Sequence, residues 1–274
     1  MLVFFAIVRK ELATVLGSPL GHKITLVHLG VALIALLLGW PVSYMLGQAH
    51  WAPAFAWWVY AEILVLSYLA LAISGDVFEL SDKIRPGEWV VYGVATPITV
   101  LFGQTVATLI TLLLWLFTSL PVFFLAKALT PITAEQLRNL AFFGALLLTT
   151  LTQVGMWMSA AVESRPWRIA AIDIAYSALM LGSLVLQRLP GGERSQLLIQ
   201  PLEVAARILH ITPQEVLGGS AVGTLVQSAL PQTTAASEPQ TLPWFSLCLV
   251  YGTILVIAGL LSFVMLRQWR NKQA

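Results

Sequence analysis

Long apolar runs alternate with short polar segments along this 274-residue chain. A helix needs about 20 mainly apolar residues to cross the hydrocarbon core of a bilayer. Strands of a membrane barrel would instead alternate in polarity at every second residue. We therefore predict an all-α integral membrane protein with six spans, at about residues 24–46, 54–74, 97–125, 139–161, 167–188 and 244–266.

The N-terminal residues 3–17 carry a different pattern, with apolar positions at helical spacing and polar ones opposite. This pattern predicts an amphipathic helix that lies in the membrane interface, within a segment covering residues 1–20. Gly17, Ser18 and Pro19 are expected to end the helix. Its predicted apolar face consists of Phe4, Phe5, Val8, Leu12, Val15 and Leu16.

Residues 189–243 form the longest stretch without a predicted span. Within it, Leu197–Leu209 and the stretch from Pro213 to about residue 230 have helical patterns, and residues 231–240 read as a polar loop. No internal repeat or second domain is evident, so residues 1–274 are predicted to form one transmembrane domain.

The distribution of lysine and arginine predicts the orientation. With the N-terminus in the cytoplasm, the inner segments hold ten of these residues and the outer segments five. Cytoplasmic loops carry an excess of positive charge. Both termini are therefore predicted to be cytoplasmic, in a prokaryotic cytoplasmic membrane, and residues 189–243 extracytoplasmic.

Composition agrees with the membrane class, because 58% of the residues are hydrophobic and only 10% are charged. Soluble domains carry about 25% charged residues. The formal charge of +2 gives no reason to expect nucleic-acid binding. The single cysteine, Cys248, excludes an internal disulfide.

Enzyme motifs are missing from the sequence. It contains no phosphate-binding loop of the GxxxxGK[ST] type, no HExxH and no GxSxG. The four histidines lack the spacing of metal ligands. We therefore expect no catalytic activity, cofactor or metal on this chain.

The ionisable residues inside predicted spans that are candidates for a functional role are His28, Glu62 and Asp173. A charge at the bilayer centre costs about 2.5–3.5 kcal/mol on insertion scales, so such residues usually face the bundle interior. They could line a translocation path or handle protons. The alternative is a structural role, as neutral or paired groups within the bundle or near its ends.

A charged segment follows the second predicted span. Six charged residues fall within 13 positions: Asp76, Glu79, Asp82, Lys83, Arg85 and Glu88. Trp89 and further apolar residues come next, before Thr96 and Pro97 open another span. Either a soluble partner docks on this segment, or the segment is a solvated loop that Trp89 anchors at the interface.

The chain resembles the membrane subunits of type-2 ABC transporters, the exporter permease family. Four features carry the resemblance. The first is the pair of motifs VRKEL (Val8–Leu12) and GSP (Gly17–Pro19) before the first span, and the second is the acidic segment after the second span. The third is TPITVLFGQ (Thr96–Gln104), which opens a third span that ends in SLP (Ser119–Pro121). The fourth is the arrangement of six spans with a helical stretch before the last one.

The resemblance implies a mechanism. Two permease subunits, identical or related, would meet through their first and fifth spans. Residues 75–96 would form a coupling segment that docks on a separate phosphate-loop ATPase, which binds ATP and Mg. The docking residues would be Glu79, Arg85, Glu88 and Trp89. The first, second and fifth spans would line the path, with Glu62, Asp173 and His28 as candidate lining residues.

The apolar path favours export of a hydrophobic or amphipathic substrate, such as a lipid, a drug or a lipid-linked glycan. Two other functions stay open. One is a secondary carrier coupled to ions or protons through the intramembrane acids. The other is a structural membrane subunit that transports nothing.

Overall fold

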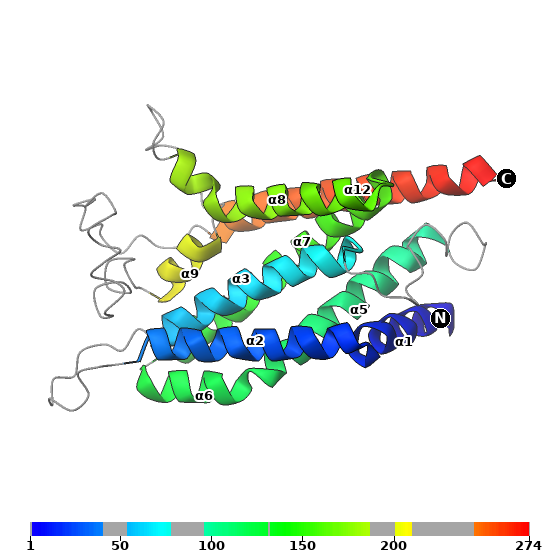
Figure 1. Ribbon diagram of the computed structural model, residues 1–274. Helices are drawn as coiled ribbons and strands as arrows, with labels where there is room; N and C mark the ends of the chain where they lie inside the picture. The colour runs from blue at the N-terminus through cyan, green and yellow to red at the C-terminus, as the bar shows by residue number, and fades with distance from the viewer. Residues whose placement is uncertain are drawn as a thin grey trace, which may run out of the picture.

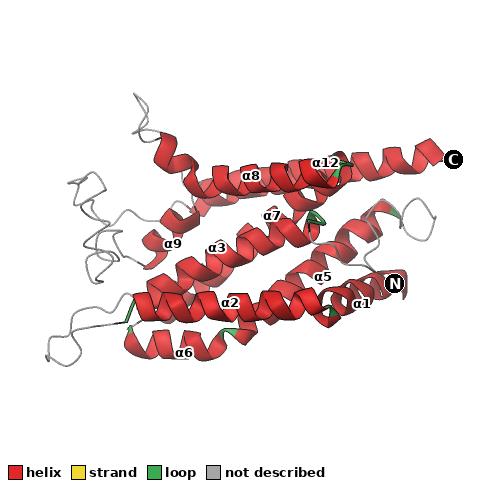
Figure 2. Cartoon of the chain, in the orientation of Figure 1, coloured by secondary structure: helices red, strands yellow, loops and turns green. Residues whose placement is uncertain are grey.

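The computed structural model describes residues 2–40, 54–77, 96–130, 132–186, 201–209 and 244–273. All elements within these ranges are α-helices (Figure 2). The helices run between two ends of an elongated bundle, and the described N-terminal and C-terminal helices reach the same end (Figure 1). We call this the terminal end and the opposite one the distal end.

Five helices in the described ranges are long and apolar enough to cross a membrane. They are α2 (Pro19–Leu38), α3 (Ala54–Ser74), α5 (Pro97–Thr118), α7 (Ala134–Ala161) and, within α12 (Trp244–Gln273), the stretch Leu247–Gln268. The chain is therefore a multi-pass membrane protein by the length and composition of its helices. The predicted fifth span corresponds to α8 (Arg165–Leu186), which is not among the five.

The first helix, α1 (Leu2–Gly17), packs along α5 at the terminal end. Its buried positions are Ile7, Val8, Glu11 and Val15, whereas Phe5 of the predicted apolar face is 61% exposed. The buried residues therefore share Val8 and Val15 with that face and add Ile7 and Glu11 from outside it. The predicted place of α1 in the membrane interface stays a prediction.

Local capping residues explain several helix boundaries. Ser18 caps α2 by accepting a hydrogen bond from the Gly21 amide, and Thr96 caps α5 in the same way. Thr133 and Gln136 form a complete capping box at the start of α7. Side-chain oxygens of this kind satisfy amides that have no partner within the helix.

The predicted third span is interrupted in the structure. Helix α5 ends at Thr118 with Ser119 as its C-cap, and a separate short helix, α6 (Leu120–Leu129), follows it. Pro121 explains the break, because proline in a continuous helix would clash with the preceding turn and could not donate a hydrogen bond. The prediction of one span over 97–125 is therefore corrected.

Two apolar clusters follow each other along α3. Phe55, Trp58 and Val59 pack at the distal end with residues of α2, α6 and the short helix α9 (Pro201–Leu209). Leu66 to Ile73 pack with α5, α7, α8 and α12. Helix α3 is thus the central element, and helix α9 covers part of the distal end.

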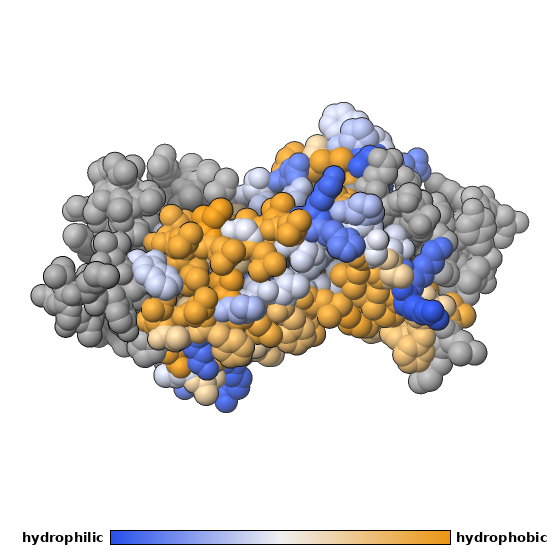
Figure 3. All heavy atoms as spheres, turned by 60° about the horizontal axis from the view of Figure 1, so that its bottom comes forward, coloured by the Kyte–Doolittle hydropathy of each residue, from blue (hydrophilic) through white to orange (hydrophobic). Residues whose placement is uncertain are grey.

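The surface of the bundle is largely apolar. Figure 3 shows a broad hydrophobic surface interrupted by separate hydrophilic groups. Helix α12 exposes Phe245, Leu249, Val256, Ile257 and Leu260, each more than half accessible. Such side chains are expected where a helix faces lipid.

Candidate functional site

The candidate site lies at the end of α3, where the predicted coupling segment begins. The docking residues Glu79, Arg85, Glu88 and Trp89 lie in residues 78–95, outside the described ranges, so their roles stay predictions. Residues Gly75–Val77 are described, and they show how the segment is attached to the membrane bundle.

Helix α3 ends in a Schellman motif. The Val77 amide donates to the Ala72 carbonyl at 2.9 Å, and the Asp76 amide donates to the Ile73 carbonyl at 3.2 Å. Asp76 takes the left-handed conformation that this motif requires, with φ of 54°. Aspartate tolerates that region better than most residues. Val77 is buried in the apolar cluster around α3, which fixes the exit direction of the chain.

Two arginines at the start of α8 hold this turn. The Arg168 Nη2 donates to the Asp76 carboxylate at 3.3 Å and to the Asp76 carbonyl at 3.2 Å. Its Nη1 donates to the Val162 carbonyl at 3.1 Å. The Arg165 guanidinium donates twice to the Val77 carbonyl, at 3.3 and 3.2 Å. We call these contacts the Asp76 clamp.

Burial makes the clamp more than a surface ion pair. The side chain of Arg168 is 1% exposed and that of Asp76 is 14% exposed. Exposed ion pairs contribute little, whereas removing one partner of a buried pair is strongly destabilising. The clamp therefore fixes the first residues of the charged segment to both α3 and α8.

The backbone of α3 also approaches α7 closely at the clamp. A methyl group at Gly155 of α7 would overlap the Ser74 side chain and lie 2.7 Å from the Leu71 carbonyl oxygen. Glycine at this position lets the two helices touch, as small residues do in membrane bundles.

Asp173 lies on α8 outside the clamp. Its Oδ1 accepts a hydrogen bond from the Tyr68 hydroxyl at 3.3 Å, and the side chain is exposed in the single chain. The Tyr68 ring stacks edge-on against Tyr176, whose hydroxyl donates to the Leu64 carbonyl at 2.9 Å. Asp173 is thus bonded by Tyr68, whereas Arg168 on the same helix contacts Asp76.

His28 and Glu62 meet inside the bundle. Their Nε2 and Oε2 atoms lie 2.8 Å apart, and the two residues are 1% and 5% exposed. The structure thus brings together two of the three predicted intramembrane residues. It does not bring Asp173 to them within the described contacts.

Glu11 on α1 is a buried acid that the sequence did not single out. It is 7% exposed and accepts a hydrogen bond from the Gln104 side chain of α5 at 3.4 Å. The signal was weak, because Glu11 follows Arg9 and Lys10 in a charged stretch that reads as a solvated face. Arg165 and Arg168 of the clamp also had no predicted contact, because the sequence shows them only as positive charges that favour the cytoplasmic side.

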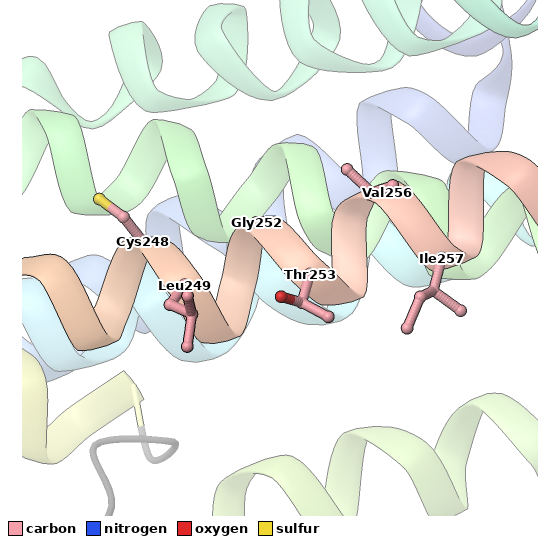
Figure 4. Close-up of a pocket in the computed structure, with 6 residues that line it drawn as sticks. All are labelled: Cys248, Leu249, Gly252, Thr253, Val256 and Ile257. Carbon is pink, nitrogen blue, oxygen red and sulfur yellow. The ribbon is translucent and has the colours of Figure 1, made fainter.

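A shallow, open hollow runs along one face of α12. Figure 4 shows Leu249, Thr253 and Ile257 pointing to one side of the helix and Cys248 and Val256 to the other. The lining is almost entirely apolar, with the Thr253 hydroxyl as its main polar group. Within the described residues, no cluster of three or more metal-ligating side chains is found.

No protein-family model and no curated protein sequence matches this chain. Its function must therefore be inferred from the residues and contacts described above.

Proposed function

We propose that this chain is the membrane-spanning permease subunit of an ATP-driven ABC transporter. A separate phosphate-loop ATPase would bind ATP and Mg and dock on residues 78–95. A second permease subunit, identical or related, would complete the path. Export of a hydrophobic or amphipathic substrate is part of this proposal.

The observation that carries the proposal is the Asp76 clamp. A subunit driven from outside the bilayer needs a rigid connection between its docking segment and its spanning helices. Arg165 and Arg168 provide one, since they join the start of the charged segment to α8 while the Schellman motif joins it to α3.

The position of the clamp suits transmission of a conformational change. A ligand or partner shifts an equilibrium between two states only through contacts that differ between them. Movement of a docked ATPase would pull on residues 78–95 and thereby on α3 and α8. The family resemblance assigns the path to the first, second and fifth spans, which correspond to α2, α3 and α8.

The proposal is tested by purifying the full chain from its native membrane and assaying the eluate for ATP hydrolysis. We expect a phosphate-loop ATPase to co-purify. The double substitution Glu88→Ala and Trp89→Ala should abolish this association. Glu135→Ala, which changes an exposed acid on α7, serves as the matched control and should retain it.

Recovery of the wild-type chain without an ATPase would overturn the proposal. Retention of the ATPase by the Glu88→Ala, Trp89→Ala variant would overturn the assignment of docking to these two residues.

A further inference from the structure

The His28–Glu62 pair lies near the middle of the membrane helices. His28 is the tenth of 20 residues in α2, and Glu62 is the ninth of 21 in α3. At 1.5 Å per residue, Glu62 lies roughly 12 Å and His28 roughly 14 Å from the first residue of its helix, which is close to half of a 30 Å hydrocarbon core. Glu62 faces His28 rather than interfacial water, so a position near the outer boundary does not explain it.

Apolar clusters enclose the pair on both sides along α3. The distal cluster contains Phe55, Trp58 and Val59, and the other begins at Leu66. Ile63, next to Glu62, packs against both clusters. The two ionisable side chains therefore share a small polar site between two apolar clusters.

Each side chain keeps one buried polar atom without a partner among the described residues. These atoms are Nδ1 of His28 and Oε1 of Glu62. The other two atoms, Nε2 and Oε2, already share a hydrogen bond. Nδ1 and Oε1 are therefore the positions of the pair that are open to a further proton.

The net charge of the pair depends on how many protons it holds. When His28 is neutral and donates its Nε2 hydrogen to Oε2 of ionised Glu62, the pair has a net charge of −1. One added proton makes the pair neutral, and a second would make it positive. A net charge in the hydrocarbon region is penalised, so the pair with one added proton is the favoured state.

The two unpartnered atoms are the places where the added proton can bind. The Nε2–Oε2 hydrogen bond already contains its own hydrogen. A proton on Nδ1 gives an imidazolium beside a carboxylate, and one on Oε1 gives a neutral histidine beside a carboxylic acid. Transfer of the shared hydrogen to Oε2 converts the first form into a neutral pair without any further group.

The other ionisable groups on the helices that pack against α2 and α3 are bonded to other partners, exposed or half-buried. Helix α5 has none between Pro97 and Thr118. The bonded groups are Arg165 and Arg168 at the end of α3, Glu11 with Gln104, Asp173 with Tyr68, Tyr176 with the Leu64 carbonyl, and the pairs Glu203–Arg207 and Glu135–Arg138. The exposed groups are Arg9, His22, Lys23 and Lys127, and Lys10 and Tyr60 are half-buried.

We propose that His28 and Glu62 form an intramembrane binding site for one exchangeable proton. The site holds the proton at Nδ1 of His28 or Oε1 of Glu62, and its release leaves a negative charge between α2 and α3. This inference does not depend on the ATPase, because it follows from the pair and its surroundings alone.

Infrared spectroscopy of the full chain in lipid nanodiscs tests the site. Spectra are compared between acidic and alkaline buffers, in H2O and in D2O. We expect one carboxylic acid band whose intensity changes with pH. This band should shift in D2O and should be missing from the Glu62→Gln variant. Ser67→Ala removes another buried polar group of α3 and should retain the band.

His28→Gln tests the contribution of the histidine. The Glu62 band should persist in this variant with a changed frequency and a changed midpoint pH. An unchanged midpoint and frequency would show that Glu62 acts alone, which overturns the proposed pair.

A wild-type measurement avoids dependence on how variants fold. Nitrogen NMR of the histidine-labelled protein, which has four histidines, should show the His28 ring nitrogens changing over the same pH range as the carboxyl band. A Glu62 carboxyl group that keeps one protonation state throughout would overturn the proposal, since the pair would then be a static contact.

Discussion

Arg168 shows how much one side chain contributes to the junction between bundle and charged segment. It bonds the Asp76 carboxylate, the Asp76 carbonyl and the Val162 carbonyl from a buried position. The sequence places Arg168 near the membrane boundary but gives no sign of its partner, because Asp76 is 92 residues away. Such long-range pairing depends on the packing of α3 against α8.

Asp76→Asn isolates the charge of the clamp. Asparagine also tolerates the left-handed conformation, so the turn should be retained while the ion pair is lost. We expect the free energy of unfolding to fall by about 1–3 kcal/mol, measured by chemical unfolding in mixed micelles. Glu135→Gln, in an exposed pair with Arg138, should change it by less than about 0.5 kcal/mol. Equal effects of the two substitutions would contradict the clamp.

The His28–Glu62 pair predicts strong coupling between two substitutions. His28→Leu or Glu62→Leu alone leaves the other polar group buried without a partner and should destabilise the bundle by about 1–3 kcal/mol. The double substitution removes both polar groups, so it should lower the free energy of unfolding by clearly less than the sum of the two single effects. A double-mutant cycle of unfolding free energies measures this, and additive effects would refute the contact.

At the scale of helices, the sequence correctly predicts that the described elements are helices and where most of them lie. The second predicted span, 54–74, agrees with α3 at both ends, since an apolar run is bounded by Pro53 and Gly75. The third predicted span, 97–125, is wrong as one continuous helix, because the apolar sequence continues past Ser119 although the helix breaks there. Side-chain contacts such as His28 with Glu62 were not predictable, since they need the relative rotation of two helices.

Two glycines of α7 provide a matched test of helix contact. A methyl group at Gly155 would overlap α3, whereas one at Gly144 meets nothing within 4 Å. Gly155→Ala should therefore destabilise the protein by about 1–3 kcal/mol. Gly144→Ala should be neutral or stabilising by up to about 1 kcal/mol. Thermal unfolding of both variants checks this, and the reverse order would contradict the close approach of α3 and α7.

At the scale of the whole molecule, α1 and the C-terminal helix reach the same end of the bundle (Figure 1), and the cytoplasmic location of both termini stays a prediction. The excess of lysine and arginine further predicts that this side is the cytoplasm. Replacing Cys248 by Ser provides a background without cysteine for testing it.

In that background, the single substitutions Arg9→Cys and Arg138→Cys each place one cysteine at one of the two ends of the bundle. Both positions are exposed. A membrane-impermeant maleimide added to intact cells should label Arg138→Cys and not Arg9→Cys. In inside-out vesicles the labelling should reverse. The opposite pattern would invert the topology and remove residues 78–95 from the cytoplasm.

The same background gives the most direct test of the proposed permease. A cysteine in place of Lys83, which is in the charged segment but not among the proposed docking residues, carries a photo-crosslinker in the native membrane, with Arg138→Cys as the control at the other end. We predict a crosslink from position 83 to a phosphate-loop ATPase, changed in yield by ATP and missing from the control. A correctly inserted chain whose position 83 crosslinks to no ATPase would contradict the account.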